Sequence, residues 1–407
     1  MWICCQLGGR EHYAIPRALV NTGEAVLLCT DIWVPQWSLL HMIPSRRLRG
    51  RYHDGLRSVT CHHFSVESIL RDSSARMTGA AGNWEKTIRK NEWFESRVVK
   101  CLRKVAHTEN VIVFAYSYAA RRIFEYAKDR GWQTILGQID PGKREEDIVR
   151  MAHERHAWLG SQSKPAPASY WSSWRKECEL ADIIMANSEW SAEMLSQEGV
   201  PKDKIRIIPL AYDVEARYQG PRRILPDSFS RERPLRILFL GQVIIRKGIG
   251  ELLDAADRLR TMPVQFIIVG PHGIDVPQRY GRHPLIRWIG PIPRSEVGAY
   301  YRAADVFLFP TLSDGFGLTQ IEAAVHGLPI ISSRRCGIVV QDGFNGILLD
   351  EVSGESIAEA IARLVDHPDL VQRLSNRPTE DCFSLGNLGA SLLSMQRELI
   401  DKKRATS

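Results

Sequence analysis

Short apolar runs alternate with amphipathic stretches along most of this 407-residue chain. The runs have the length and composition of buried strands in a parallel sheet. The stretches between them place apolar residues on one helical face, as at positions 249, 252, 253, 256 and 259. This alternation predicts an α/β protein built from repeated strand–helix units. The predicted strands cover residues 2–6, 25–30, 58–64, 111–115, 133–137, 181–188, 204–209, 235–240, 265–269, 286–289, 305–309 and 328–332.

The alternation is interrupted by a polar stretch rich in Pro, Arg and Ser before residue 234. A stretch of that composition without periodicity is typical of a linker. A chain of 407 residues is also too long for one ordinary core and suits two domains. We therefore predict two β/α domains that face each other across a cleft. The first covers residues 1–215, the linker 216–233 and the second 234–384.

Composition places the chain among soluble globular proteins, with 44% hydrophobic and 25% charged residues. No apolar run approaches the length that spans a bilayer, and the N-terminus has no basic leader of a signal peptide. The 8 cysteines form no C-x-x-C pair, so neither a zinc knuckle nor a redox motif is indicated. We expect a protein of the reducing cytoplasm, free or peripheral at a membrane surface.

The net charge of +7 is unevenly distributed, because arginines crowd one short segment of the first domain. Such a face could meet an anionic membrane or a charged acceptor, and it could equally be a solvated surface. No nucleic-acid-binding motif accompanies the charge, so no nucleic acid partner is expected. The basic segment contains Arg46, Arg47, Arg49, Arg51 and Arg57.

The first domain also contains histidines that could be metal ligands and a serine that could cap a helix. His62 lies in a predicted strand. His153 and His156 share a predicted helix without a third metal ligand, and we interpret them as surface or acceptor-side residues. Ser117 is well placed to cap the helix that follows the strand at 111–115. No metal site is predicted.

The richest candidate chemistry lies in the second domain, after the strand at 305–309. Asp314, Gly315, Phe316 and Gly317 form a predicted tight turn, and a helix opens at Leu318. The turn and the helix N-terminus together leave backbone N–H groups for an anion. Two carboxylates stand nearby, Asp314 and Glu322. The segment therefore predicts a site for a phosphate-bearing ligand with hydroxyl groups, unless it is an ordinary strand–loop–helix connection.

Three further places carry candidate ligand contacts. Gly8 and Gly9 follow the first strand, where a phosphate or sugar can approach the backbone. Asp140 follows the strand at 133–137, at the sheet edge where ligands bind in such folds. A loop bounded by glycines, from Gly241 to the residue after Lys247, carries two adjacent cations. Cations at a helix start oppose the helix dipole, which favours an anionic ligand over a merely solvated helix start.

Several segments together resemble glycosyltransferase family 4, whose fold, called GT-B, has two Rossmann-like domains facing across a cleft. In order and spacing they cover most of the chain, and the second half matches best. They are LGGREH at 7–12, ADIIMANS at 181–188, KIRIIPLAYD at 204–213, FLGQVIIRKGIGELLDA at 239–255, DVFLFPTLSDGFGLTQIEAAVHGLPII at 305–331 and DGFNGILLD at 342–350.

The resemblance implies a retaining transferase that moves a sugar from a nucleotide-sugar donor to an acceptor hydroxyl, in carbohydrate biosynthesis. The family's E-x7-E motif falls on Asp314 and Glu322. It implies that Glu322 binds the donor ribose and that Asp314 contacts the donor sugar. Lys247, with Arg246 beside it, matches the basic pair that binds the diphosphate. The fold also implies a helix at 385–402 that returns to the first domain, and no metal or other cofactor.

The chain departs from the family pattern at four positions. Asp314 replaces the longer Glu, Gln242 replaces a basic residue, the segment at 138–140 lacks a frequent histidine, and no acid follows Gly337. Two alternatives therefore stay open. One is a nucleotide-sugar epimerase of the same fold, and the other is a non-catalytic sugar-nucleotide-binding protein.

Overall fold

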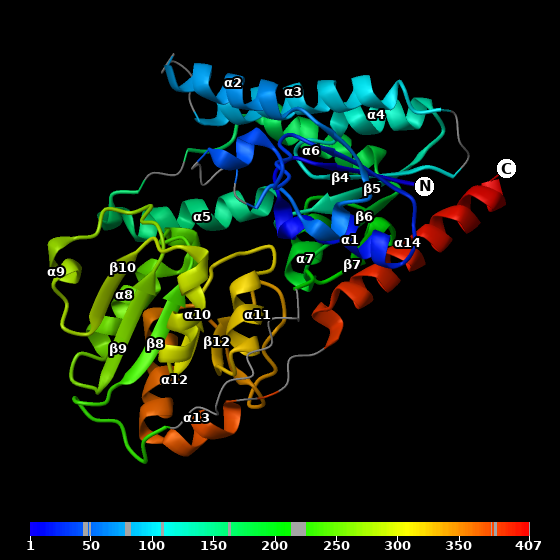
Figure 1. Ribbon diagram of the computed structural model, residues 1–407. Coiled ribbons are helices and arrows are strands. Elements are labelled where there is room, and N and C mark those ends of the chain that lie inside the picture. Colours follow the sequence, from blue (N-terminus) through cyan, green and yellow to red (C-terminus); the bar gives the residue numbers. More distant parts are fainter. Residues whose placement is uncertain are drawn as a thin grey trace.

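A computed structural model shows two parallel sheets, each covered by helices on both faces (Figure 1). The predicted α/β class with two facing Rossmann-like halves is confirmed. The boundary predicted at 216–233 lies partly outside the described residues and stays a prediction. The structure describes residues 1–43, 48, 50–77, 83–106, 110–161, 164–212, 225–375, 377 and 381–406.

The first sheet has seven strands in the order β3-β2-β1-β4-β5-β6-β7. Every neighbouring pair is parallel, and β1 is an interior strand, with β2 and β4 on either side. The side chains of β1 alternate between the two faces: Trp2 and Cys4 enter one core, and Ile3 and Cys5 the other. Its strands are β1 (Trp2–Gln6), β2 (Val26–Thr30), β3 (Thr60–His63), β4 (Ile112–Tyr116), β5 (Gln133–Gln138), β6 (Ile183–Ala186) and β7 (Ile205–Ile207).

Helices cover both faces of this sheet. On one face α3, α4 and α6 pack together, and on the other α1 packs against α14, the last helix of the chain (Figure 1). α14 therefore returns to the first half and closes its core with Leu388 and Leu392. The helices are α1 (Ala14–Asn21), α2 (Ser65–Met77), α3 (Asn83–Leu102), α4 (Arg121–Asp129), α5 (Lys143–Arg155), α6 (Ala168–Leu180), α7 (Glu189–Gln197) and α14 (Leu385–Thr406).

The second sheet has six parallel strands in the order β10-β9-β8-β11-β12-β13. Its strands are β8 (Leu235–Leu240), β9 (Val264–Val269), β10 (Ile286–Gly290), β11 (Val306–Phe309), β12 (Ile330–Ser333) and β13 (Gly346–Leu349). Its helices are α8 (Ile249–Arg258), α9 (Gln278–Gly281), α10 (Arg294–Ala303), α11 (Leu318–Val325), α12 (Gly354–Asp366) and α13 (Pro368–Leu374).

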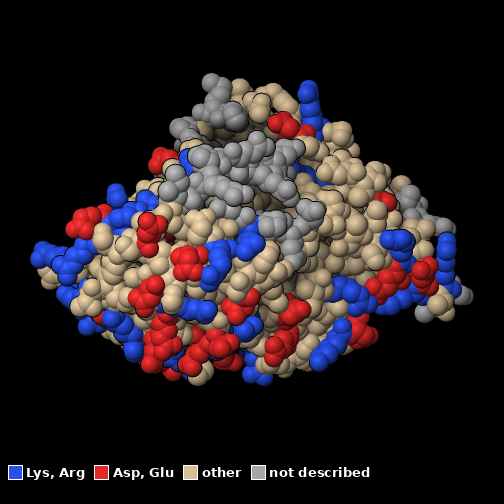
Figure 2. Space-filling view, turned by 90° about the horizontal axis from the view of Figure 1, so that it is seen from below, with Lys and Arg blue, Asp and Glu red and all other residues tan. Residues whose placement is uncertain are grey.

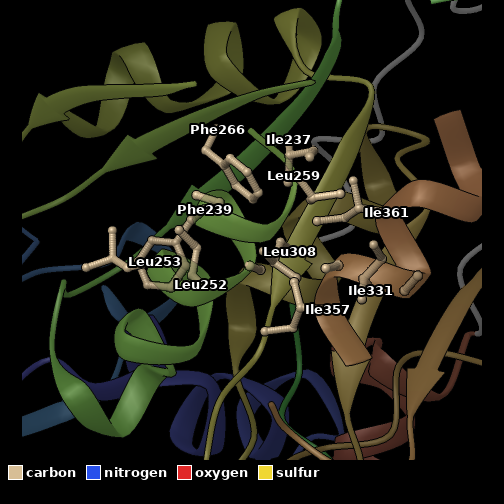
Figure 3. Packing of buried hydrophobic residues seen from close by; sticks show 14 of the residues in the cluster. Ile237, Phe239, Leu252, Leu253, Leu259, Phe266, Leu308, Ile331, Ile357 and Ile361 are labelled. Atoms are coloured by element: carbon tan, nitrogen blue, oxygen red, sulfur yellow. The ribbon is translucent and has the colours of Figure 1, made fainter. Parts of the chain in front are cut away.

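The larger core of the second half lies under α8 and α12 (Figure 3). Leu252 and Leu253 of α8 and Ile357 of α12 are buried in one cluster with the strand residues Phe239 and Leu308. The predicted apolar stripe of α8 is thus the face that packs on the sheet. The charged side chains on the face seen from below are of both signs and are interspersed (Figure 2).

α5 follows β5 of the first sheet, yet its far end packs on the second half. It runs along the border between the halves (Figure 1). Ala152 of α5 and Leu159, just beyond it, are buried in the same core as α8 and β8. The backbone N–H of Asp275 donates to the carbonyl of Leu159 at 3.0 Å. α5 therefore joins the two halves through apolar contacts as well as through the chain.

The interpretation of His156 as a surface residue is wrong, and its alternative as an acceptor-side residue stays a prediction. The residue is 7% exposed, and its Nε2 lies 2.8 Å from Oε1 of Glu251 on α8. Gly250 makes room for this contact, because a Cβ there would stand 2.6 Å from the ring. His153, by contrast, is half-buried and contacts the carbonyl of Ser161. His156 is thus part of the seam between the halves.

The predicted cap at Ser117 is also wrong. α4 begins only at Arg121, after Ala120, and has no side-chain cap. Ser117 instead accepts a hydrogen bond from the backbone N–H of Ile139 at 3.3 Å. Buried Glu177 of α6 accepts from the N–H groups of Tyr118 and Ala120, which stabilises the start of α4 from a different helix.

Candidate functional site

The candidate site lies where loops of the two halves meet. Gly315 of the second half abuts the first, because a Cβ there would stand 2.3 Å from the carbonyl oxygen of Ile139. Trp190 of α7 donates to the hydroxyl of Ser313 at 3.0 Å. His12 of the first loop contacts Arg294 at the start of α10. These contacts bring the predicted residues of the second half against the carboxyl ends of the first sheet.

The two predicted cations, Arg246 and Lys247, lie beside Asp314. They occupy the turn between β8 and α8, and Gly248 allows this turn to press against β11 because a Cβ there would collide with the carbonyl of Pro310. Lys247 pairs with Oδ2 of Asp314 and lies 4.9 Å from the ring centre of Phe309. The structure thus brings together three residues that the sequence predicts for one site.

Arg246 is held by three oxygen atoms. Its Nη1 donates to the carbonyl of Ser313 at 2.8 Å, and it lies 3.5 Å from Oδ1 of Asp314 and 3.4 Å from Oε1 of Glu145. Burial alone would raise the pKa of Asp314, but the neighbouring Lys247 and Arg246 outweigh it and lower that pKa. Asp314 is therefore a carboxylate at neutral pH.

The glycine turn before α11 presents unused backbone donors. Gly317 has a φ of 91°, a left-handed conformation that favours glycine, and α11 starts at Leu318. In the described part of the chain, no hydrogen bond is made by the backbone N–H groups of residues 315–319. Phe316 is 2% exposed, and its side chain packs in the core of the second half. These free donors at a helix start suit an anion.

Glu322 lies on the first turns of α11, half-buried. The hydroxyl of Tyr301 donates to its Oε2 at 2.9 Å. Burial raises the pKa of Glu322, and the Tyr301 hydrogen bond and the charge of Arg294 offset only part of that effect. Tyr301 therefore fixes the orientation of the carboxyl group that is predicted to bind the ribose.

Asp140 follows β5, as predicted, but its carboxylate is committed to its own loop. Its Oδ1 accepts hydrogen bonds from the hydroxyl of Tyr118 and from the backbone N–H of Gly142 at 2.9 Å. Gln138 donates to both its side chain and its backbone carbonyl. Asp140 thus shapes the start of α5, and its role as a ligand contact stays a prediction.

The predicted glycines lie in two loops: Gly8 and Gly9 follow β1 in the first half, and Gly241 follows β8 in the second half. The N–H of Gly8 donates to Oδ1 of buried Asp31 at 2.9 Å, and a Cβ on Gly9 would stand 2.9 Å from the carbonyl oxygen of Gly50. The N–H of Gly241 donates to the carbonyl of Val269 at 3.0 Å, and the chain after β9 can approach Gly241 because a Cβ on Gly270 would stand 1.7 Å from the Gly241 carbonyl oxygen. Among the described contacts, the first loop reaches the second half through His12 and not through Gly8 or Gly9.

Other residues near the site were not predicted. Gln320 is fully buried and ties the glycine turn to the next loop, because its Nε2 donates to the carbonyls of Phe316 and Gly337 at 3.0 and 3.2 Å. Glu145 contacts Arg246, Tyr301 donates to Glu322, and the charge of Arg294 lowers the pKa of Glu322 against the effect of burial. For Gln320, its position in the helix directly after the turn could have indicated that it bonds to that turn. For Glu145, Arg294 and Tyr301 the sequence offers no such signal.

A pocket of about 430 Å³ opens beside the site, between α5 and α7. Trp190 and Met194 line it together with Leu312 and Arg335 of the second half. None of the predicted site residues lines this pocket. It borders the site through Ser313, which bonds to both Trp190 and Arg246.

The described residues hold no cluster of three His, Cys, Asp or Glu side chains suited to a metal ion. The predicted independence from metal and other cofactors is not tested by this observation and stays a prediction. None of the described helices has the length and apolar character needed to cross a bilayer.

The two facing Rossmann-like halves have the GT-B fold, and cations, carboxylates and free N–H groups lie at their seam. Residues 234–367 match the family described as glycosyl transferases group 1. The D-inositol 3-phosphate glycosyltransferase of Kribbella flavida is 24% identical over 279 residues, 62% of this chain and 66% of that protein. Its counterpart in Corynebacterium glutamicum is 31% identical over 254 residues, 56% of this chain and 60% of that protein.

Solved structures share the fold over the whole chain. Sucrose-phosphate synthase of Thermosynechococcus elongatus has a TM-score of 0.64 at 16% identity, covering 99% of this chain and 100% of that one. HepE of Anabaena, solved with UDP, has a TM-score of 0.57 at 12% identity, covering 99% of each chain. These matches confirm the resemblance to glycosyltransferase family 4. The chain aligns with only 54 to 66% of the length of the first curated relatives.

Proposed function

We propose that this protein is a retaining glycosyltransferase that moves a sugar from a nucleoside diphosphate sugar to an acceptor hydroxyl. The curated relatives are glycosyltransferases by name, and two neighbouring structures of HepE hold UDP or UDP-glucose. The observation that carries the proposal is the pairing of Arg246 and Lys247 with Asp314 beside the unused N–H groups of residues 315–319.

The arrangement suits the departure of a nucleoside diphosphate. Breaking the glycosyl–phosphate bond leaves negative charge on the diphosphate, and fixed cations and N–H dipoles stabilise that charge as it develops. Lys247 and Arg246 are already held in place by Asp314 and by the carbonyl of Ser313, so little reorganisation is needed. Glu322, oriented by Tyr301, would accept hydrogen bonds from the ribose hydroxyls. Asp314 would contact the sugar.

Donor binding is the direct test. UDP, GDP and ADP, and the matching glucose or mannose donors, would be added to the protein in a thermal unfolding assay. A ligand that binds only the folded state raises the free energy of unfolding by about 2.7 kcal/mol at a hundredfold excess over Kd, and it thereby raises the midpoint. NMR of the product would then give the configuration at the anomeric carbon. No shift with any nucleotide would contradict the proposal, and an inverted product would contradict retention.

Glu322→Ala is expected to weaken nucleoside diphosphate binding by at least roughly tenfold, because hydrogen bonds to a charged group contribute about 1.5–3 kcal/mol. Isothermal titration calorimetry measures the affinity directly. Glu296→Ala is the matched control, since Glu296 is an exposed acid of α10. Equal affinity of Glu322→Ala and wild type would remove the ribose assignment.

The two alternatives have no observation in their favour. An epimerase would convert the donor sugar in the absence of any acceptor, which an NMR time course of the donor would reveal. A non-catalytic binding protein would bind the nucleotide and leave the donor intact with every acceptor. Either result would replace the transferase proposal.

We also propose that the first half contacts an anionic membrane surface. Arg46, Arg47 and Arg49 of the predicted basic segment lie outside the described residues, and Arg51 pairs with buried Asp31. Exposed Arg57 lies 5.9 Å from the ring centre of Trp37. Trp37 and Leu39 are 67% and 83% exposed, so apolar and cationic groups share this surface as in peripheral proteins.

Sedimentation with vesicles is the measurement for this proposal. The protein is expected to bind vesicles that contain phosphatidylserine more tightly than vesicles of phosphatidylcholine alone. The double variant Trp37→Ser with Leu39→Ser is expected to lose most of this binding, whereas Met151→Ser, another exposed apolar residue, should retain it. Equal binding of both vesicle types, or of wild type and double variant, would contradict the membrane contact.

A further inference from the structure

Glu145 lies at the start of α5, the helix that joins the two halves. Its Oε1 is 3.4 Å from Nη1 of Arg246, and its side chain is only 16% exposed. The groups that face it are the guanidinium of Arg246, the carboxylates of Asp140 and Asp314 and the hydroxyl of Ser313. Arg144, its neighbour on the same helix, pairs instead with Glu198 at 3.3 Å. Glu145 is thus a carboxyl group of the candidate diphosphate site.

The cluster around Glu145 holds more acids than cations. Asp140, Glu145 and Asp314 are three carboxyl groups, and Arg246 and Lys247 are two cations, so full ionisation leaves a net charge of −1 where an anion is to bind. Burial raises the pKa of Glu145 to about 7, an effect that Arg246 reduces and that Asp140 and Asp314 increase. Asp314 keeps its charge through its pairs with Lys247 and Arg246. The excess negative charge is therefore removed most easily at Glu145.

Glu145 is also fixed relative to the cations. The far end of α5 is buried in the core of the second half through Ala152 and Leu159, and His156 bonds to Glu251 of α8. Only Gly248 separates the turn that holds Arg246 and Lys247 from α8. Glu145 and the two cations therefore rest on one packed unit.

We propose that Glu145 is a positioning residue of the diphosphate site and that it takes up one proton from solvent when a nucleoside diphosphate binds. The neutral carboxyl group leaves Arg246 free to point at the diphosphate and removes one repulsive charge. This proposal rests on the proposed function, since it needs a diphosphate at Arg246 and Lys247. The proposal adds Glu145, a residue of the first half, to that site, and it makes diphosphate affinity depend on pH.

The direction in which diphosphate affinity changes with pH follows from the charges of the cluster and the ligand. A bound diphosphate raises the pKa of Glu145 above its value in the free protein, because a second anion disfavours the carboxylate. Above about pH 7 the free protein must take up the proton on binding, so affinity falls by up to roughly tenfold per pH unit until Glu145 is ionised in the complex as well. Well below that pH the group is protonated in both states and contributes no pH dependence.

Calorimetric titration of UDP at about pH 8, in buffers of different ionisation enthalpy, measures the protons taken up on binding. GDP and ADP serve as probes if UDP does not bind. Wild type is expected to take up close to one proton more than Glu145→Gln, and Glu145→Gln is expected to bind more tightly at this pH. Asp147→Asn is the matched control, because it removes an acid of the same helix that lies outside the cluster, and its uptake should equal that of wild type.

The outcomes separate the two proposals. Diphosphate binding with equal proton uptake in wild type and Glu145→Gln would overturn the role of Glu145 and leave the proposed function intact. Binding of none of the three diphosphates would overturn both. If Glu145→Gln does not fold, the wild type alone decides, since an affinity that does not change from pH 7 to about pH 9 would overturn the proton uptake.

Discussion

Replacement of Lys247 by alanine is expected to lower the turnover number at least about a hundredfold, because removal of one preorganised charge stabiliser has that effect in other active sites. Lys247 pairs with Asp314 and lies over the ring of Phe309, so its ammonium group is held before any donor arrives. Under the proposed function, its charge would stabilise the leaving diphosphate more than the bound donor. The turnover number should therefore fall more than the Michaelis constant rises.

Steady-state kinetics of nucleoside diphosphate release give both constants for the variant. Lys202→Ala is the control, since Lys202 is exposed in a turn before β7 and should keep wild-type rates. Thermal unfolding of the Lys247 variant would show that the second half is still folded. A turnover number close to that of wild type would mean that the diphosphate is stabilised elsewhere and would contradict the site.

The order of strands and helices could be predicted from the sequence because parallel strands are short and apolar and their helices carry a 3.6-residue stripe. The stripe of α8 and the glycine stop after α11 indicate those helices without further information. The position of α5 could not be predicted in this way. Its apolar residues fit a helix, but periodicity does not say which sheet the helix covers, and Leu159 packs in the core of the second half.

The same limit applies to His156. A histidine on a polar helix usually faces solvent, and only the pairing with Glu251, which is 95 positions away, makes burial favourable. Within the site, local patterns indicated Asp314, Lys247 and Glu322, because each lies next to a glycine turn or a helix start. The partners Glu145 and Tyr301 lie on other elements, and nothing in their local sequence connects them to the site.

Asp305→Asn is expected to destabilise the second half by about 3 kcal/mol, because loss of one partner leaves a buried ionic network incomplete. The side chain of Asp305 is fully buried at the start of β11 and accepts from Arg233 at 2.7 Å and from Arg236 at 3.0 Å. The backbone N–H of Arg236 donates to it as well, at 2.9 Å. Asp305 thus ties β11 to β8 in the middle of the sheet. Thermal unfolding should show a midpoint lower by roughly 6–12 °C.

Exposed Asp350 is the matched control for this variant. It pairs with Arg334 at 3.3 Å, but its side chain is 94% exposed, so Asp350→Asn should change stability by less than about 0.5 kcal/mol. The two variants differ in burial and in the number of partners, and not in the chemical change. An equally small effect of both would mean that the Asp305 network contributes no net stability to the sheet.

The effect of Asp305→Asn should depend on pH in one direction. Burial alone would raise the pKa of Asp305, but the bonds from Arg233 and Arg236 outweigh it and lower that pKa. A carboxyl group with a lowered pKa stabilises the fold at pH values above its unfolded pKa of about 3.9, and this stabilisation is lost as pH falls through the lower folded value. The difference between wild type and Asp305→Asn should therefore be full at neutral pH and shrink in acid. A difference that grows as pH falls below about 4 would show that Asp305 is not held as a carboxylate by its two arginines.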